Sequence, residues 1–271
     1  MYKLIVCDLD ETLLNDAGVL TAGNITAIKA AMAKGVYFVP NSGRSYTSFQ
    51  DNLADLGLKN KADTYSISYN GGLIIENKDN RPLAQHTLDF ETAKAVFELA
   101  LASGGSVHLY TADHGYLCQP SQWDLAYLKQ RGVHFEILEN PNFEDFRDAL
   151  IMKVIVAFPK MADRQALKDK VLTQVKTPLT ATFSSDRYIE FNAAEADKGR
   201  ATLELAEKLG LTAEQVIAVG DNSNDLAMIQ AAGLGVCMAN GLDGVKAQAQ
   251  YVTQSDNNQD ALKEIIERFI L

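Results

Sequence analysis

Cysteine is scarce in this 271-residue chain, and its scarcity argues against two kinds of stabilising site. The three cysteines, Cys7, Cys118 and Cys237, are widely spaced, odd in number and without a C-x-x-C pair. A disulfide framework or a zinc site needs paired or closely spaced thiols, so neither is expected. We expect each cysteine to be a small buried apolar residue, and the protein to work in a reducing cytoplasm.

Long apolar runs are missing as well. No stretch approaches the roughly 20 apolar residues that a membrane-spanning helix needs. The short apolar run near the start of the sequence is interrupted by Asp8 and Asp10, and a signal peptide needs a longer uninterrupted core. The sequence therefore predicts neither a targeting signal nor a membrane partner.

Positive charge is in deficit, because 25 Lys and Arg against 35 Asp and Glu give a net charge of −10. A general nucleic-acid binder needs clustered Lys and Arg to neutralise phosphates, so no nucleic-acid partner is expected. A small phosphorylated metabolite is compatible with this balance, because a metal ion or a local cationic site can override the global charge. The composition, 47% hydrophobic and 22% charged, is that of an ordinary globular protein and indicates no particular oligomeric state.

The first and last thirds of the chain alternate strand and helix patterns. Short apolar runs such as residues 4–7 and 216–219 are typical of strands buried on both faces. Strands alternating with helices predict an α/β fold with a parallel sheet flanked by helices. The middle of the chain mixes both patterns with longer polar stretches. We therefore predict a Rossmann-like core over residues 1–81 and 187–271, with an inserted α+β domain over 82–186.

The first chemical motif is Asp8-Leu9-Asp10-Glu11-Thr12, directly after the first apolar run. Strand side chains two residues apart point to one side, so Asp8 and Asp10 could address one point at the sheet edge. In open parallel sheets, ligands bind at the carboxyl ends of the strands. An ionised aspartate can act as a nucleophile, and its neighbour can protonate a leaving alkoxide and later activate water. An ordinary acidic turn is the alternative interpretation.

A second acidic cluster, Gly220-Asp221-Asn222-Ser223-Asn224-Asp225, follows the apolar run 216–219. The carboxylates of the two clusters would repel one another unless a cation lay between them. Magnesium takes oxygen ligands and is commonly held by one or two carboxylates, so we predict a Mg²⁺ site here. The alternative is a plain helix cap, because Asp, Asn and Ser are preferred at helix starts.

Two further polar groups fit a phosphoryl-binding site. Ser42, in Asn41-Ser42-Gly43-Arg44, follows an apolar run and could hold a phosphoryl oxygen together with nearby backbone N–H groups. Lys198 precedes an expected helix and could neutralise a phosphoryl group. Taken alone, Ser42 is better explained as a helix cap and Lys198 as a solvated surface residue. Four polar clusters at the ends of successive elements favour a shared site.

In this order, the four clusters resemble the four motifs of the haloacid dehalogenase-like superfamily. The chain is similar in particular to the Cof-type phosphatases, which carry a large α/β cap domain between the second and third motifs. The resemblance covers nearly the whole chain, including Asn70-Gly71-Gly72, which resembles the Asn-Gly-Ala turn of that group. Glu11 stands where Cof-type proteins usually carry glycine.

The resemblance implies a role for each matching residue. Asp8 resembles the nucleophile that forms an aspartyl-phosphate, and Asp10 resembles the general acid/base. Asp8, Asp10 through its backbone carbonyl, and Asp221 match the groups that hold Mg²⁺. Asp225 would support the metal from behind its ligands. The residues that match phosphoryl-binding positions are Ser42, Gly43, Lys198 and Asn224.

Asp10 favours phosphate-ester hydrolysis over dehalogenation, because an alkoxide benefits from a proton on leaving and a halide does not. The resemblance implies magnesium-dependent hydrolysis of a sugar phosphate or of a phosphorylated cofactor such as pyridoxal phosphate or flavin mononucleotide. The implied cap would close over the site and select the substrate. Two alternatives stay open. One is a phosphomutase, which requires a bisphosphate activator, and the other is a non-catalytic sensor that binds phosphometabolites without turnover.

Overall fold

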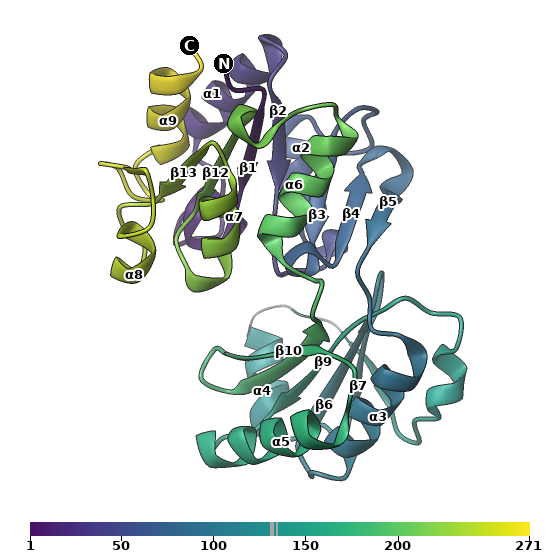
Figure 1. Ribbon diagram of the computed structural model, residues 1–271. Helices are drawn as coiled ribbons and strands as arrows, with labels where there is room; N and C mark the ends of the chain where they lie inside the picture. Colours follow the sequence, from purple (N-terminus) through teal and green to yellow (C-terminus); the bar gives the residue numbers. More distant parts are fainter. Residues whose placement is uncertain (131–132, 134) are drawn as a thin grey trace. The chain divides into compact units, whose positions relative to one another are not determined.

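The computed structural model describes residues 1–130, 133 and 135–271, and the chain divides into two units (Figure 1). The first, here called the core, combines Met1–Gln85 with Ala196–Leu271, and the second, here called the insert, is His86–Glu195. These boundaries lie later in the chain than the expected ones at 81/82 and 186/187.

Strand pairing explains both differences in the boundaries. β5 (Arg81–Gln85) pairs with β4 (Leu73–Glu76) of the core, so the core continues to the end of that strand. β11 (Tyr188–Ala193) pairs with β9 (Ile151–Ala157) and β10 (Leu179–Ser184), so it belongs to the insert. The sequence pattern of β11 alone does not say which sheet it joins.

The core is built on a parallel sheet of five strands in the order β14-β13-β12-β1-β2. Its register places Cys7 beside Pro40 on one side and Val219 on the other. The residues that follow these three strands therefore emerge at one edge of the sheet, as the α/β prediction requires. The strands are β1 (Leu4–Cys7), β2 (Tyr37–Pro40), β12 (Val216–Gly220), β13 (Leu234–Cys237) and β14 (Tyr251–Val252).

Helices cover both faces of this sheet, which explains why its strands are apolar throughout. Ile5 and Cys7 pack with helices α1 and α9, whereas Leu4 and Val6 pack in a separate buried cluster with helices α6 and α7. Burial of apolar surface on both faces is a main source of the sheet's stability. The helices of the core are α1 (Ala22–Ala33), α2 (Gln50–Leu56), α6 (Lys198–Lys208), α7 (Leu226–Ala231), α8 (Asp243–Lys246) and α9 (Ala261–Phe269).

An antiparallel sheet of three strands, β3-β4-β5, lies beside β2 in the core. A single parallel bridge joins Asn41, the residue after β2, to Ile67 of β3 (Tyr65–Ser68). The turn between β3 and β4 is Tyr69–Gly71, where all three residues have positive φ angles of 55°, 55° and 94°. This turn therefore lies next to the loop that follows β2.

The insert is built on a six-stranded sheet in the order β10-β11-β9-β6-β7-β8, antiparallel except for the pair β7–β8. Val154 and Val156 of β9 pack in an apolar cluster with helices α3 and α5. The alternate residues Ile155 and Ala157 pack with Tyr127 of α4, so helices lie on both faces. The further elements are β6 (Ser106–Thr111), β7 (Gly115–Cys118), β8 (Glu136–Leu138), α3 (Phe90–Leu101), α4 (Gln122–Gln130) and α5 (Met161–Gln174).

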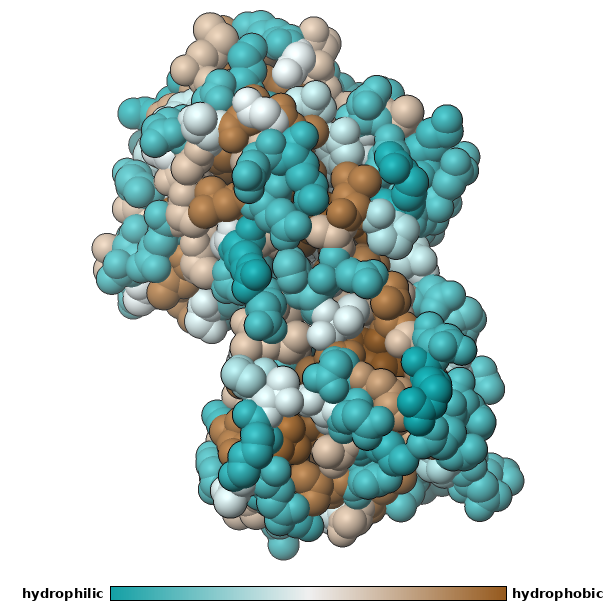
Figure 2. Space-filling model, turned by 45° about the vertical axis from the view of Figure 1, so that its right-hand side comes forward, coloured by the Kyte–Doolittle hydropathy of each residue, from teal (hydrophilic) through white to brown (hydrophobic). Residues whose placement is uncertain are grey.

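Hydrophilic side chains make up most of the face drawn in Figure 2, with smaller hydrophobic patches between them. Exposed large apolar side chains come from distant parts of the sequence, for example Val19, Ile137 and Leu203. In the described part of the chain, no helix combines the length and the apolar character that crossing a membrane would require.

Candidate active site

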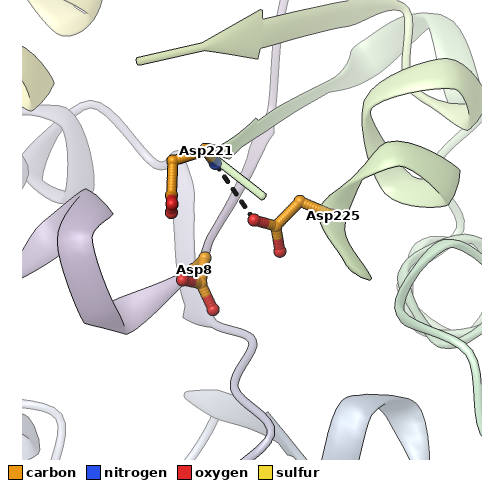
Figure 3. A group of neighbouring side chains, drawn as sticks. All are labelled: Asp8, Asp221 and Asp225. Atoms are coloured by element: carbon orange, nitrogen blue, oxygen red, sulfur yellow. Dashed lines mark hydrogen bonds between the residues drawn. The ribbon is translucent and has the colours of Figure 1, made fainter. Parts of the chain in front are cut away.

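The carboxyl ends of β1 and β12 carry the first acidic residues of the site. Asp8 follows β1 directly, and its backbone N–H donates to the carbonyl of Val219 (2.9 Å). Asp221 follows β12 directly, and Asp225 stands at the start of α7. Carboxylate oxygens of the three aspartates lie within 4.8 Å of one another, and all three residues are buried (Figure 3). The two acidic motifs of the sequence thus meet at one point.

Lys198, the first residue of α6, places its ammonium group between two of these carboxylates. Its Nζ donates to Asp8 Oδ1 (2.5 Å) and to Asp225 Oδ1 (2.6 Å), and the side chain is buried. Burial alone would lower the pKa of Lys198, but the charges of Asp8 and Asp225 outweigh it and raise the pKa above its usual value. Lys198 is therefore a buried cation of the site and not a solvated surface residue.

The charges of this cluster do not balance, because three buried carboxylates face one ammonium group. Burial raises the pKa of Asp8 to about 8; Lys198 opposes the shift, and the neighbouring carboxylates add to it. Burial also raises the pKa of Asp221 to about 6, although a hydrogen bond from Thr12 lowers it. Additional positive charge would stabilise both ionised carboxylates. This set of oxygen donors fits Mg²⁺.

Asp225 differs from the other two aspartates because protein donors engage both of its carboxylate oxygens. Oδ1 accepts from Lys198, and Oδ2 accepts from the backbone N–H groups of Asp221 and Asn222 (both 3.0 Å). Asp8 and Asp221 use Oδ1 to accept from Lys198 and from Thr12 Oγ1 (2.5 Å), respectively. This arrangement suits Asp225 to hold the loop that begins with Asp221 and Asn222. The Oδ2 atoms of Asp8 and Asp221 are the oxygens that could bind a cation.

Asp10 lies beyond this buried cluster, and its side chain is 51% exposed. Arg44 holds it with two hydrogen bonds, from Nε to Asp10 Oδ2 (2.8 Å) and from Nη2 to Oδ1. Ser42, buried in the loop after β2, accepts the backbone N–H of Arg44 at its Oγ (3.1 Å). The helical turn that follows is capped by Ser45, so helix capping does not account for Ser42.

The turn Tyr69–Gly71 gathers the other residues expected to bind a phosphoryl group. Asn224 Nδ2 donates to Asn70 Oδ1 (3.2 Å), and the backbone N–H of Asn70 donates to the carbonyl of Ser42 (2.9 Å). A Cβ added to Gly43 would lie 3.0 Å from Asn70 Oδ1, so a larger residue would press against this amide. Ser42, Gly43 and Asn224 are therefore arranged around Asn70.

Glu11 occupies a conformation that favours glycine, with a φ of 58°. Its carbonyl accepts a hydrogen bond from Asn240 Nδ2 (2.7 Å), which holds the peptide in place. Burial is the main cause of the raised pKa of Asp221, and the negative charges of Asp225 and Glu11 raise it further. The glycine-to-glutamate departure seen in the sequence thus adds negative charge beside the acidic cluster.

Comparison with known proteins identifies the family. The family model of haloacid dehalogenase-like hydrolases matches residues 5–266 of the chain. The chain belongs to this hydrolase family.

Relatives of this haloacid dehalogenase-like hydrolase align over nearly the whole chain. YxeH of Bacillus subtilis, whose name places it among the phosphatases, is 32% identical over 100% of this chain and 99% of its own. YcsE of the same organism, named a 5-amino-6-(5-phospho-D-ribitylamino)uracil phosphatase, is 31% identical over 99% of this chain and 96% of its own. A solved haloacid dehalogenase-like hydrolase from Bacteroides thetaiotaomicron is 27% identical and matches over 100% of both chains with a TM-score of 0.86.

The predictions of the family, of the α/β fold and of a phosphatase enzyme are confirmed by these similarities. The roles of the individual site residues stay predictions. Three residues without a predicted role also contact the site of this hydrolase: Thr12, Arg44 and Asn70. Each belongs to a motif quoted from the sequence. Their places in these motifs could have marked the three residues as site candidates, but only the folded chain shows which partner each one contacts.

Proposed function

We propose that this hydrolase is a magnesium-dependent phosphatase that acts on small phosphate monoesters through an aspartyl-phosphate on Asp8. The buried cluster of Asp8, Asp221 and Asp225 around Lys198 is the observation that carries the proposal. It combines a carboxylate nucleophile, a fixed cation and oxygen donors that suit Mg²⁺. Phosphoryl transfer depends mainly on positioning and on charge stabilisation, and this cluster is suited to supply both.

In the proposed first step, Asp8 attacks phosphorus while the bond between phosphorus and the ester oxygen breaks. Asp10 gives its proton to that departing oxygen. In the second step, ionised Asp10 takes a proton from water, whose oxygen attacks phosphorus and releases Asp8 as a carboxylate with inorganic phosphate. Asp10 therefore acts first as an acid and then as a base.

The transferring phosphoryl group develops charge that the site must balance. Lys198 supplies one fixed positive charge, and the loops that carry Ser42, Gly43 and Asn224 supply hydrogen-bond donors. Mg²⁺ held by Asp8, the Asp10 carbonyl and Asp221 would supply further charge stabilisation when bound. These roles follow from the residue chemistry together with the family resemblance.

For the substrate, we propose a sugar phosphate or a phosphorylated cofactor. The name of YcsE describes a phosphate on a ribityl chain attached to a uracil, a small molecule of this kind. The insert is proposed to act as the cap that selects the substrate. The proposed setting remains the cytoplasm, and no nucleic-acid or membrane partner is proposed.

The test is phosphate release from p-nitrophenyl phosphate, with magnesium and with a chelator, by the wild type and by Asp8→Asn. We expect magnesium-dependent turnover that Asp8→Asn abolishes. A panel of sugar and cofactor phosphates then follows with the same pair. If folded wild type released phosphate from none of these, the proposal would be wrong. Binding of phosphate esters without turnover would then favour the sensor, and turnover that requires a bisphosphate would favour the phosphomutase.

A further inference from the structure

Arg44 makes a two-pronged contact with Asp10. Its Nε and Nη2 donate to different oxygens of the Asp10 carboxylate, so the two planar groups meet in a fixed relative orientation. A lysine in the same place would offer a point charge and fix the carboxylate less strictly. The contact therefore constrains where the carboxylate of Asp10 points.

The backbone of Arg44 is itself anchored on both sides. Its N–H donates to Ser42 Oγ (3.1 Å), and its carbonyl accepts the N–H of Tyr69 (3.1 Å). Asp10 lies in the helical turn Leu9–Leu13 after β1, where its own backbone is extended (φ −71°, ψ 132°), and its side chain is exposed. The anchored backbone of Arg44 therefore suits its guanidinium group to hold the exposed carboxylate of Asp10.

We propose that Arg44 is a positioning residue that directs Asp10 toward the departing ester oxygen: when Asp10 carries the proton, one of its oxygens still accepts from Arg44 and the other bears the proton that the ester oxygen takes. This inference rests on the proposed function, in which Asp10 protonates that oxygen. An exposed aspartate without such a partner samples several side-chain rotamers, and only some of them place an oxygen within hydrogen-bond reach of the leaving group. Small losses of alignment cost large factors in rate.

The leaving group provides a readout for this role. An alkoxide needs a proton as it departs, whereas a p-nitrophenolate ion leaves readily without one. Loss of a residue that positions the acid therefore slows the hydrolysis of alkyl phosphates much more than the hydrolysis of aryl phosphates. A residue that binds the phosphoryl group, or merely supports the fold, affects both kinds of substrate alike.

The experiment compares kcat and KM of the wild type, Arg44→Gln and Arg44→Lys on glycerol 2-phosphate and on p-nitrophenyl phosphate. We expect Arg44→Gln to lower kcat on glycerol 2-phosphate by at least about tenfold and on p-nitrophenyl phosphate by less than about threefold. Arg44→Lys should retain part of the kcat on glycerol 2-phosphate that Arg44→Gln loses. Added guanidinium ion should restore turnover of glycerol 2-phosphate by Arg44→Ala.

Arg81 provides a matched control within the core. Its Nε and Nη2 donate to Glu76 Oε2 (3.0 and 2.6 Å), so Arg81→Gln also removes a guanidinium–carboxylate pair. We expect the kcat of Arg81→Gln on both substrates to stay within about twofold of the wild type, because its partner Glu76 is not one of the site residues.

A double-mutant cycle with Asp10→Asn separates the remaining outcomes. When Asp10 is already replaced, Arg44→Gln should lower kcat on glycerol 2-phosphate no further. Equal losses on both substrates, a change in KM alone, or additive losses in the cycle would overturn the role of Arg44 while the phosphatase activity stood. Absence of phosphate release by the wild type would instead overturn the proposed function, together with the inference that rests on it.

Discussion

Both units of the molecule bury charged side chains, but they balance the charges differently. In the insert, Glu190 faces Lys153 (3.0 Å). Asp124 Oδ2 lies 2.6 Å from His108 Nε2, and Asp124 Oδ1 accepts from the hydroxyl of Tyr188 (3.1 Å). Each acidic group of the insert cluster, defined by these five residues, has at least one close partner of its own.

The core cluster, defined by Asp8, Asp221, Asp225 and Lys198, has more negative than positive groups. The consequence is visible in the pKa values. Burial would raise the pKa of Glu190, but Lys153 and Ser184 hold it below its usual value. Burial raises the pKa of Asp221 instead. Burial of charge alone therefore does not distinguish the two clusters, whereas the unbalanced negative charge identifies the one suited to a cation.

The largest expected effect comes from replacing the proposed nucleophile. Asp8→Asn keeps the size of the side chain but removes the attacking carboxylate, so kcat should fall by at least about a thousandfold. Phosphate release at saturating substrate measures it. Glu190→Gln, the matched change in the insert cluster, should keep most of the activity on p-nitrophenyl phosphate. An equal loss in both variants would break the contrast between the clusters.

Removing the lysine from each cluster should have unequal effects on stability. Lys198→Met leaves two adjacent buried carboxylates without their cation, and the free energy of unfolding should fall by about 3–5 kcal/mol. Lys153→Met leaves Glu190 without its cation, but Glu190 keeps its hydrogen bond from Ser184. The free energy of unfolding should therefore fall by less, about 1–3 kcal/mol. Urea denaturation of the metal-free proteins gives both values. A larger loss for Lys153→Met would contradict the charge-balance explanation.

Magnesium should stabilise the core cluster and not the insert cluster. At a magnesium concentration 100 times the dissociation constant, binding to the native state alone adds about 2.7 kcal/mol to the free energy of unfolding. Thermal melts with and without magnesium would show a rise in Tm for the wild type. The rise should be lost in Asp221→Asn and kept in Glu190→Gln. Retention of the full rise in Asp221→Asn would place the cation elsewhere.

The smallest effect is a dependence on pH that belongs to the insert. Because the pKa of Glu190 is lower in the folded state than its usual value of 4.5, the unfolded state binds more protons near that pH. The stabilisation by Glu190 is thus fully present above pH 4.5 and is lost as the pH falls through the folded pKa. The free energy of unfolding, followed from pH 7 to 3, should fall less steeply for Glu190→Gln than for the wild type.

Much of the core could be predicted because its sequence pattern has a direct physical cause. Parallel strands with helices on both faces must be apolar throughout, and their carboxyl ends meet at one edge. The acidic clusters after residues 4–7 and 216–219 therefore converge as expected. Apolar residues also recur at helical spacing over residues 21–34, and this stretch forms α1 (Ala22–Ala33).

What could not be predicted depends on pairing between distant residues. β11 has an apolar pattern that fits either unit, and only its register with β9 assigns it to the insert. The contact between Arg44 and Asp10 spans 34 residues and depends on how two loops are held. The lysine at 198 resembles any surface lysine until the fold buries it between Asp8 and Asp225.

The core is assembled from two separate stretches of chain, and this has a consequence for its synthesis on the ribosome. Asp8 and Lys198 are 190 residues apart, which at roughly 5–20 residues per second corresponds to about 10–40 seconds of translation. Until β12 is made, β1 lacks one of its two neighbours in the sheet. The insert, made from one continuous stretch, is complete before the core can close. The proposed nucleophile is therefore synthesised early, but its site is assembled only after the C-terminal segment emerges.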